Sequence, residues 1–323
     1  MKQQHEKEMG SNVLMKNLNK KIRYRIIRYR IRDTFKPKNI IILILGLFLA
    51  IICLSYLYLL LFGIFSSLKT LNNFSEDMFG FPRRIYYENY IIAFTRLFYP
   101  VRLANGGTRR VMFPELIWNT LLFSTLPVII TIMTQEMVAY VCTKYKFRFN
   151  KVLHLMVVFV VVMPAVNSLG QKIIFLKTLG FYDNYWALLY GSIVFADYNF
   201  LIWYGTFKSV PTDYIEAARI DGAGHYATMF KIIFPMVRVQ FVVLFVLGFI
   251  TKWNNYMDVL TTMPSFPVLS LALLSFQWDT TTYVGWPTVQ LAAAMIVAFP
   301  CIILFIVFQP LLVGNLTMGG LKA

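Results

Sequence analysis

Long blocks of apolar residues, almost free of charge, limit what this chain can fold into more than any other feature. Each block is roughly twenty residues long, which is the length of helix that crosses the hydrocarbon core of a bilayer. Helices are expected rather than strands, because lipid cannot satisfy exposed backbone polar groups. Of the 323 residues, 58% are apolar or aromatic and only 14% are charged, which is little charge for a soluble domain of this length. The sequence therefore predicts an all-α integral membrane protein.

Six transmembrane helices are predicted from these blocks, and an even number places both termini on one side of the membrane. The expected spans are residues 40–65, 116–141, 152–176, 186–207, 241–260 and 289–312. Twelve Lys and Arg residues precede Asn39, and basic residues are enriched on the cytoplasmic side, so both termini should be cytoplasmic. We expect a basic cytoplasmic arm at residues 1–39 and a transmembrane domain at residues 40–323. The arm should lie near anionic membrane lipids rather than bind nucleic acid, because no nucleic-acid-binding motif accompanies it.

The loops between the spans mostly agree with this topology. Residues 144–151 contain four basic side chains and are predicted inside, as is the segment at 208–238. Residues 66–114 are predicted outside although they contain seven Lys and Arg residues, because the charge rule weakens for longer loops. We expect this extracellular loop to form a small cap with a short helix at residues 86–94.

The segment between the fourth and fifth predicted spans interrupts the apolar pattern with E-A-A-R-I-D-G-A-G-H-Y-A-T-M-F-K-I-I-F-P. Ser209 is predicted to cap a helix that has Pro211 in its first turn. The dipeptide Asp221-Gly222 indicates a helix end or turn. A second helix should follow, and Pro235 limits its continuity into the fifth span. Three alanines leave little side-chain bulk, so the surface of another protein is expected to approach the backbone closely.

The order E-A-A-x-x-D-G-A, followed by an apolar run and a proline, resembles the EAA loop of permease subunits of binding-protein-dependent ABC importers, which have the MetI-like fold. The matching positions are Glu216, Ala217, Ala218, Asp221, Gly222, Ala223 and Pro235. A second proline that often follows four residues later is Val239 here, so the resemblance does not fix the angle at which the fifth span begins. The stretches Y-Y-E-N-Y, L-G-F-Y-D-N-Y-W-A-L and F-Q-P-L-L-V-G-N-L-T-M-G-G-L-K-A are similar to the carbohydrate-importer branch. The resemblance extends from about residue 66 to the end of the chain.

The resemblance implies a subunit that forms half of the translocation pathway for a carbohydrate, most simply an oligosaccharide. Its loop would be a coupling helix that docks on a separate cytoplasmic ATPase dimer. A second, different permease chain and an extracellular solute-binding protein would complete the importer in the bacterial inner membrane. ATP and Mg would bind to the ATPase, because the sequence has no G-x-x-x-x-G-K-[ST] motif of its own. No cofactor, catalytic residue or metal ligand is expected in this chain.

Polar residues inside predicted spans are costly and therefore mark candidate substrate-pathway positions. Aromatic rings beside amides and carboxylates suit a polyhydroxylated ligand, because rings cover its C–H faces and polar groups bind its hydroxyls. The candidates are Asn167, Gln171, Asp197, Tyr198, Asn199, Trp253, Asn254, Tyr256 and Asp258. Each has an alternative role in tying helices together, pairing with a partner subunit or forming an interfacial aromatic belt. Glu136 and His154 are expected to be packing or interfacial residues, and the three cysteines buried small residues.

Other functions remain to be weighed against this one. A secondary transporter would be expected to have more intramembrane ionisable residues and a repeated half. An integral-membrane enzyme would be expected to have a convergent motif such as H-E-x-x-H or G-x-S-x-G, and neither occurs. A permease for a non-sugar solute is also an alternative. The arginines of residues 66–114 would complement either an acidic rim on the solute-binding protein or an acidic saccharide.

Overall fold

The computed structural model describes residues 37–316 apart from residues 104, 146, 164–168, 190 and 282. The chain divides into two units, residues 1–63 and 64–323, and each is described by itself. The described part is mostly helical, as predicted. The predicted basic arm falls almost entirely outside the described residues, as does Asn167.

Helix α2 (Pro37–Ser67) contains the first predicted span. It is apolar on all sides, and its only charged residue is Lys38 near the start. A helix that is hydrophobic all round has no polar face for water and is suited to a bilayer. The stretch Ile40–Ser67 is long and apolar enough to cross a membrane.

Two further helices are long and apolar enough to cross a membrane, α5 (Phe113–Lys144) and α15 (Pro287–Leu316). Both contain prolines inside the helix, which a bundle in lipid tolerates because neighbouring helices satisfy the freed backbone groups. These two helices and α2 are the three clear spans among the described residues. They match the predicted first, second and sixth spans.

The predicted fifth span corresponds to α12 (Arg238–Trp253). It is preceded by a helical segment, and the two halves, His225–Met236 and Arg238–Trp253, meet at an angle of 71°. The pair would make a fourth span if it crossed the membrane as one element. A break follows Trp253, so the end of the predicted span becomes a separate helix, α13 (Tyr256–Thr262).

The predicted third and fourth spans are not single helices. The third contains α6 (Asn150–Val162) and α7 (Leu169–Thr178), with residues 164–168 outside the described part. The fourth contains a short 3₁₀ turn, η1 (Tyr185–Leu188), and then α8 (Tyr198–Ser209). Asp197 explains the late start of α8, because its carboxylate accepts a hydrogen bond from the backbone N–H of Tyr198 and caps the helix.

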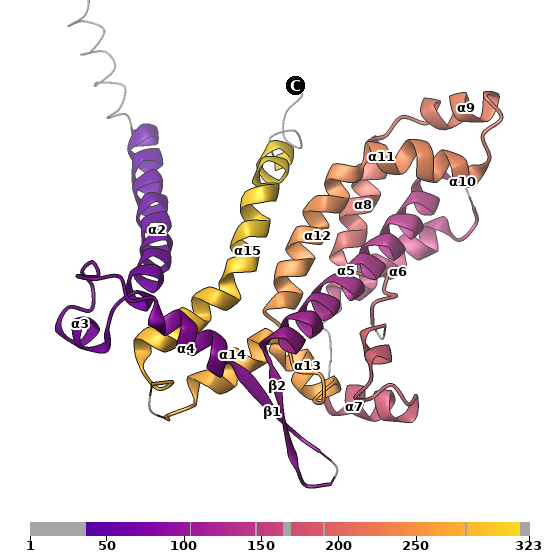
Figure 1. The fold of residues 1–323 in the computed structure, drawn as a ribbon. Helices are drawn as coiled ribbons and strands as arrows, with labels where there is room; N and C mark the ends of the chain where they lie inside the picture. The colour runs from indigo at the N-terminus through magenta and orange to yellow at the C-terminus, as the bar shows by residue number, and fades with distance from the viewer. Residues whose placement is uncertain are drawn as a thin grey trace, which may run out of the picture. The chain divides into compact units, whose positions relative to one another are not determined.

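Three helices run side by side to form the middle of the second unit, with α5 packed against α8 and α12 (Figure 1). Trp203 and Phe207 of α8 are fully buried and stack on each other at 5.6 Å. Gly248 allows α12 to approach α5, because a Cβ at this position would lie 2.7 Å from Cγ1 of Val128. Helix α15 packs against α12 on the other side.

One end of this bundle is covered by short elements (Figure 1). These are α3 (Leu71–Glu76), α4 (Glu88–Arg96), strands β1 (Phe98–Arg102) and β2 (Thr108–Met112), α13 and α14 (Leu269–Gln277). Helix α4 confirms the short helix expected at residues 86–94, shifted by two residues. The antiparallel β1–β2 hairpin was not expected, so the fold is helical but not all-α.

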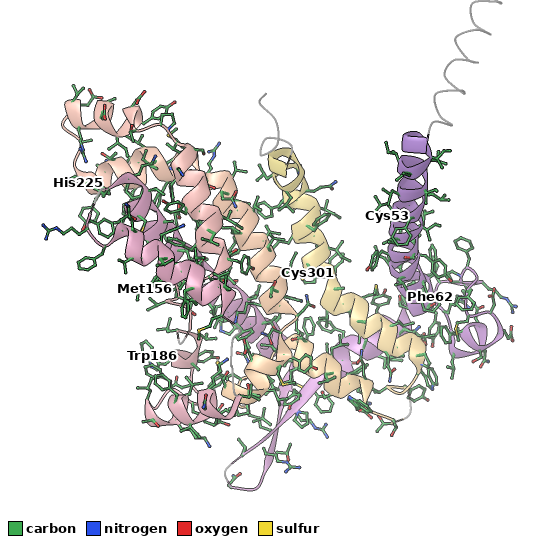
Figure 2. The ribbon with its side chains drawn as sticks, turned by 180° about the vertical axis from the view of Figure 1, so that it is seen from behind. Cys53, Phe62, Met156, Trp186, His225 and Cys301 are labelled. Atoms are coloured by element: carbon green, nitrogen blue, oxygen red, sulfur yellow. The ribbon has the colours of Figure 1, made fainter. Side chains whose placement is uncertain are left out.

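The opposite end of the bundle is formed by α9 (Asp213–Ile220), α10 (His225–Ala227), a π-helical turn η2 (Thr228–Ile233) and α11 (Phe234–Met236). We call residues 210–237 the elbow. His225 lies at the elbow, and Trp186 lies toward the other end of the bundle (Figure 2). The elbow and the short-element end are therefore separated by the length of α5, α8 and α12 (Figure 1).

Candidate functional site

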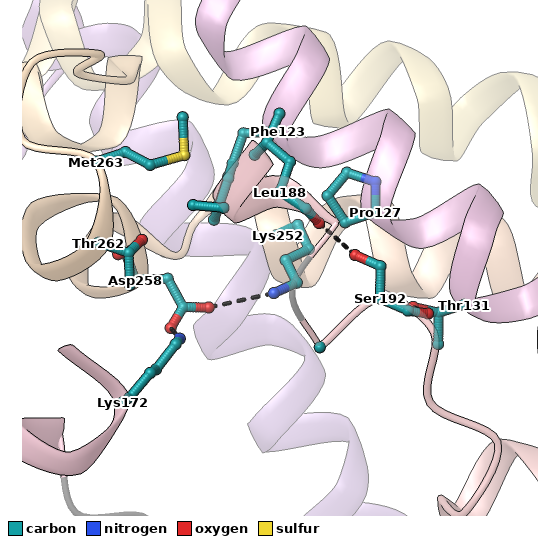
Figure 3. Close-up of a pocket in the computed structure, with 12 residues that line it drawn as sticks. Phe123, Pro127, Thr131, Lys172, Leu188, Ser192, Lys252, Asp258, Thr262 and Met263 are labelled. Carbon is teal, nitrogen blue, oxygen red and sulfur yellow. Dashed lines mark hydrogen bonds and ion pairs between the residues drawn. The ribbon is translucent and has the colours of Figure 1, made fainter. Parts of the chain in front are cut away.

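A small cavity of about 60 Å³ lies at the end of the bundle away from the elbow (Figure 3). Its walls come from α5, α7, η1, α12 and α13 together with the turn after η1. The apolar side is made by Phe123, Leu188 and Met263. The cavity therefore depends on residues that are far apart in the sequence.

Three charged side chains form the polar side of this cavity, and we call them the triad. Nζ of Lys172 lies 2.9 Å from Oδ1 of Asp258, and Nζ of Lys252 lies 3.2 Å from Oδ2 of the same carboxylate. Asn255 caps α13 and also donates from Nδ2 to Oδ2 of Asp258 at 3.0 Å. The side chains are partly accessible, with 33% of each lysine and 27% of the aspartate exposed. Two ammonium groups against one carboxylate leave the triad with one net positive charge.

Hydroxyl groups and an aromatic ring complete the surroundings of the triad. Oγ1 of Thr131 donates to the carbonyl of Ser192 at 2.8 Å, and Oγ1 of Thr262 donates to the carbonyl of Asp258 at 2.6 Å. Each hydroxyl oxygen keeps lone pairs that can accept a further hydrogen bond. The ammonium of Lys252 also lies over the ring of Phe123 at 5.4 Å, a cation–π contact. The arrangement can bind a polar group that carries oxygen atoms.

The elbow contains the residues of the E-A-A motif. Gly222 has a φ of 77°, a conformation that favours glycine, and a Cβ there would meet nothing within 4 Å. Asp221 is the C-cap of α9, and the N–H of Ala223 donates to the carbonyl of Ala218 at 2.9 Å. This confirms the turn predicted at Asp221-Gly222. The predicted cap at Ser209 is wrong, since Ser209 ends α8 and Thr212 precedes α9 without a side-chain cap.

Ala218, one of the three small residues expected to let a partner approach the backbone, is buried within the elbow. Its side chain is buried with Ile215 one turn earlier, because these two residues pack α9 against η2. Glu216 and Ala217 are exposed on the other side of the same helix. The small side chain of Ala218 therefore serves close packing inside the elbow, and Ala217 remains at its surface.

The bend after the elbow lies where the proline pattern predicted a break. Pro235 cannot donate a backbone hydrogen bond, and the helix before it widens into the π turn η2. The helix then breaks at Val237, and α12 starts at an angle of 71° to the preceding segment. Val239 lies in the first turn of α12, so the second proline of the motif is not needed for a sharp bend.

Four large apolar or aromatic side chains of the elbow are exposed, and the sequence analysis did not predict this. Ile220 is 86% exposed and Tyr226 is 79% exposed, and Tyr214 and Phe230 are also exposed. We call these four residues the elbow patch. They come from α9, α10 and η2, the helical segments of the elbow. Exposed apolar residues gathered in this way mark an interaction surface.

The elbow is fixed to three long helices rather than two. Tyr140 near the end of α5 contacts the rings of Phe207 in α8, at 5.6 Å, and Phe234 in α11, at 6.2 Å. Nζ of Lys144 in α5 donates to the carbonyl of Val210, at the start of the elbow. The hydroxyl of Tyr145 lies 2.9 Å from Nδ1 of His225. A displacement of the elbow would therefore move α5 as well as α8 and α12.

Comparison with known proteins identifies this architecture. The profile described as "Binding-protein-dependent transport system inner membrane component" matches residues 120–314, which is more than half of the chain. The chain belongs to this family. It is thus a membrane-embedded transporter component, a permease, and not a member of an enzyme family.

Named relatives of this permease include two sugar transport proteins. It is 26% identical over 294 residues to the trehalose/maltose transport system permease protein MalG of Thermococcus litoralis, covering 88% of this chain and 97% of the relative. It is 24% identical over 241 residues to the arabinooligosaccharides transport system permease protein AraQ of Halalkalibacterium halodurans, covering 75% and 81%. A bacterial ABC transporter involved in the import of the acidic polysaccharide alginate contains a chain of the same fold. That chain matches with a TM-score of 0.67 and 20% identity, covering 85% of this permease and 98% of the solved chain.

Among the predicted substrate residues of the permease, Asp258 lines the cavity and Trp253 does not. Trp253 is fully buried, stacks on Phe249 at 5.3 Å and donates from Nε1 to the carbonyl of Val297 at 3.1 Å. It therefore joins α12 to α15. Asn254 is the C-cap of α12 and donates to the carbonyl of Ile250, and Tyr256 is half-buried in the packing around α13.

The remaining predicted positions lie elsewhere. Asp197 caps α8, and Tyr198 and Asn199 occupy the first turn of that helix. Gln171 lies in α7 one residue before Lys172 and is not among the residues that line the cavity. Asn167 is outside the described residues. Of the eight predicted substrate positions that the structure describes, Asp258 alone lines the cavity.

Lys172 and Lys252 are the cavity residues that sequence reasoning missed. Both lie inside predicted spans, at residues 152–176 and 241–260, where an ionisable side chain is as costly as the amides that were selected. The sequence did contain a signal for both lysines. Lys172 is adjacent to Gln171 and Lys252 is adjacent to Trp253, and both neighbours were selected as candidates. The pairing with Asp258 could not be seen, because Lys172 lies 86 residues away in the sequence.

The basic residues of the predicted exterior loop are mostly engaged within the permease. Lys69 is fully buried and donates to the carbonyls of Asp77 and Met78 at 2.8 and 3.0 Å. Arg83 pairs with Glu76 and Arg109 with Glu115, each at 2.6 Å, and Arg110 lies over the ring of Phe98. Arg84, Arg96 and Arg102 have no ion-pair partner among the described residues.

The other residues considered from the sequence have packing positions. Glu136 is buried on α5, two turns before the end of that helix, and the ring of His154 packs on Tyr204 at 4.5 Å. Cys142 is buried and Cys301 half-buried, whereas Cys53 is exposed on α2, which differs from the expectation. Within the described part of the chain, no group of three or more His, Cys, Asp or Glu residues is placed to hold a metal ion.

Proposed function

We propose that this permease forms half of the translocation pathway of an ATP-driven importer for an oligosaccharide. The family and the names of its relatives, which transport trehalose/maltose and arabinooligosaccharides, support this substrate class. The transported sugar would enter from the cavity end of the bundle. The elbow end would receive the driving force.

The single observation that carries the proposal is the elbow patch on a segment bound to three long helices. A separate ATPase dimer, which binds the ATP and Mg, would dock on this patch. Its closure would move the elbow, and α5, α8 and α12 would move with it between inward-open and outward-open states. Such coupling requires that the elbow make different contacts with two conformations of the ATPase. Glu216, Ala217, Asp221 and Gly222 would lie at or beside this interface.

The proposed topology has six spans, with both termini and the elbow in the cytoplasm. Lys144, Arg148 and Lys151 follow one another at the elbow end of α5, which agrees with the charge rule for cytoplasmic loops. The third and fourth spans would each combine shorter helices. Irregular backbone at membrane depth is tolerated where it is buried in protein or lines an aqueous cavity, and η1 with the turn after it lines the cavity.

Two further partners follow from this function. A second, different permease chain would form the other wall of the pathway, and an extracellular solute-binding protein would deliver the sugar to the cavity end. The importer would reside in the bacterial inner membrane. Arg84, Arg96 and Arg102 are the basic residues of the exterior loop that are available to an acidic rim on the solute-binding protein.

The test is co-purification of the ATPase with a variant of the elbow patch. Gly222 is a poor site for this test because its positive φ strains any other residue. Ile220→Asp changes an exposed side chain, so the fold of the elbow should survive, while the interface loses a buried apolar contact. We expect at least tenfold less ATPase to co-purify, as for loss of an interface hot spot.

Ile85→Asp is the matched control, because Ile85 is also an exposed isoleucine but lies in the exterior loop before α4. It should retain the ATPase at the level of the unchanged protein. A cysteine crosslink from Ala217→Cys to the ATPase in the working complex provides a second readout. Equal ATPase recovery with Ile220→Asp and Ile85→Asp, together with no crosslink, would refute the docking role of the elbow.

A further inference from the structure

We propose that the triad makes the cavity a site for an anionic group, so that the permease transports an acidic saccharide bearing a carboxylate. The proposal rests on the import function and names its substrate class. A neutral sugar and an acidic one differ in how they would interact with Lys172 and Lys252. The contacts and charges of the cavity favour the acidic one.

The charge balance is the first step. Among the described residues, the triad contains all the charged side chains that line the cavity, and it retains one net positive charge. An uncompensated charge in a partly buried site is unfavourable, and a monovalent anion would neutralise it. A neutral hydroxyl cannot do so. The same charge would disfavour a cationic solute.

The geometry is the second step. The two ammonium groups already converge on one carboxylate, at 2.9 and 3.2 Å from its two oxygens, because Asp258 occupies the position between them. The lysines approach from different helices, α7 and α12, so each can donate to a second carboxylate through its remaining N–H groups. The dashed contacts in Figure 3 show Asp258 between the lysines, with the hydroxyls of Thr131, Ser192 and Thr262 around the same cavity.

The size of the cavity is the third step. A volume of about 60 Å³ open to the centres of water molecules is room for several of them, because about 10–15 Å³ of such space holds one. The cavity therefore has room for a carboxylate group. The acidic group would lie beside the triad, with the apolar side of the cavity, Phe123, Leu188 and Met263, next to the rest of the saccharide.

The first experiment measures whether an acidic sugar protects the lysines. The purified complex in nanodiscs of zwitterionic lipid is treated with an amine-acetylating reagent, and acetylation of each lysine is measured by mass spectrometry. Sodium glucuronate should slow the acetylation of Lys172 and Lys252 at concentrations at which glucose has no effect. Lys177 is the internal control, because it lies on the same helix but outside the cavity, over the ring of Tyr182.

Equal protection by glucose and glucuronate, or protection by neither, would overturn the proposal. A membrane lipid is another source of an anionic group. Protection that appears when anionic phospholipid is added to the nanodiscs, and that glucuronate does not reproduce, would also overturn it. These results do not depend on the solute-binding protein, which has its own sugar preference.

Substitutions supply the second experiment. Lys252→Gln should raise the glucuronate concentration that half-protects Lys172 about tenfold or more, because one charged hydrogen-bond donor is lost. Asp258→Asn removes the competing carboxylate and should lower that concentration. Lys177→Gln should leave it unchanged. A purely structural triad would give no change of glucuronate affinity with Lys252→Gln and weaker, not stronger, binding with Asp258→Asn.

The failure of the import function would be recognised separately. ATP-driven uptake is measured with the same complex in proteoliposomes. Absence of any ATP-driven uptake, with selective glucuronate protection retained, would refute the import function and leave the anion site standing. Robust uptake of neutral oligosaccharides with no protection by glucuronate would refute only the acidic substrate.

Discussion

The cavity and the elbow lie at opposite ends of the same bundle and have opposite chemistry. The cavity places three charged side chains where they are partly removed from water, and the elbow exposes large apolar side chains where a soluble surface would be polar. Each arrangement is unfavourable for an isolated chain. Each becomes favourable when a partner of matching chemistry binds, an anionic group in one case and an apolar protein surface in the other.

The two regions show how the permease can bind substrate at one end of the bundle and receive the movement of the ATPase at the other. The cavity is a meeting point of five elements, so any relative motion of α7, α12 and α13 changes it. The elbow is one compact segment packed on α5, α8 and α12. Helix α12 joins the two regions directly, since it begins at the elbow and carries Lys252 near its other end. Motion of the elbow would therefore reach the triad along one helix.

The largest expected effect comes from substitutions that disrupt one of the two regions and leave the other unchanged. The double variant Ile220→Asp with Tyr226→Asp should reduce ATP-driven uptake at least a hundredfold, because two exposed apolar contacts are replaced by charges. Glucuronate protection of Lys172 should not change in this variant. Lys252→Gln should show the reverse pattern, with the ATPase retained and protection weakened. If either variant altered both readouts equally, the two regions would not be separable.

A smaller effect is expected from disrupting the close contact between α12 and α5 at Gly248. Gly248→Leu would force α12 away from α5, because even a Cβ lies 2.7 Å from Val128. Overpacking of this kind costs about 1–3 kcal/mol, which should appear as a lower midpoint of thermal unfolding of the purified permease. Val128→Ala in the same chain should restore part of the loss. No loss in Gly248→Leu would mean that α5 and α12 do not pack as described.

The sequence predicted the elbow better than the cavity, for a physical reason. The turn at Asp221-Gly222 and the break near Pro235 depend on local backbone chemistry, which a short motif contains. The elbow patch, like the buried position of Ala218, depends on how two helices pack, and the motif does not specify that.

The cavity could not be predicted, because its charges meet only through tertiary contacts. Lys172, Lys252 and Asp258 belong to three helices, and nothing in the periodicity of each helix indicates that they converge. The predicted fourth span failed as a continuous helix because hydropathy counts apolar residues and does not weigh a cap. Asp197 starts α8 within an apolar block, and the break before it lies beside the cavity.

A substitution at Trp253 distinguishes a packing role of this residue from a role in substrate binding. Trp253→Phe keeps the ring that stacks on Phe249 but removes the Nε1–H bond to the carbonyl of Val297. The loss of one buried hydrogen bond should destabilise the permease by about 1 kcal/mol, measured by thermal unfolding. Uptake and glucuronate protection should be unchanged. A marked loss of sugar affinity at unchanged stability would restore Trp253 to the substrate pathway.

The smallest expected effect concerns Asp197, which lies at neither region. Asp197→Ser keeps a side-chain oxygen at the N-cap of α8 and should be nearly neutral, whereas Asp197→Ala should cost about 1 kcal/mol in thermal stability. The pair of variants differs only in the cap, so the difference in unfolding midpoint measures it. If Asp197→Ser reduced uptake as strongly as Asp197→Ala while both proteins were equally stable, the carboxylate would act on substrate or on a partner subunit. The permease would then have a third functional region at the start of α8, between the cavity and the elbow.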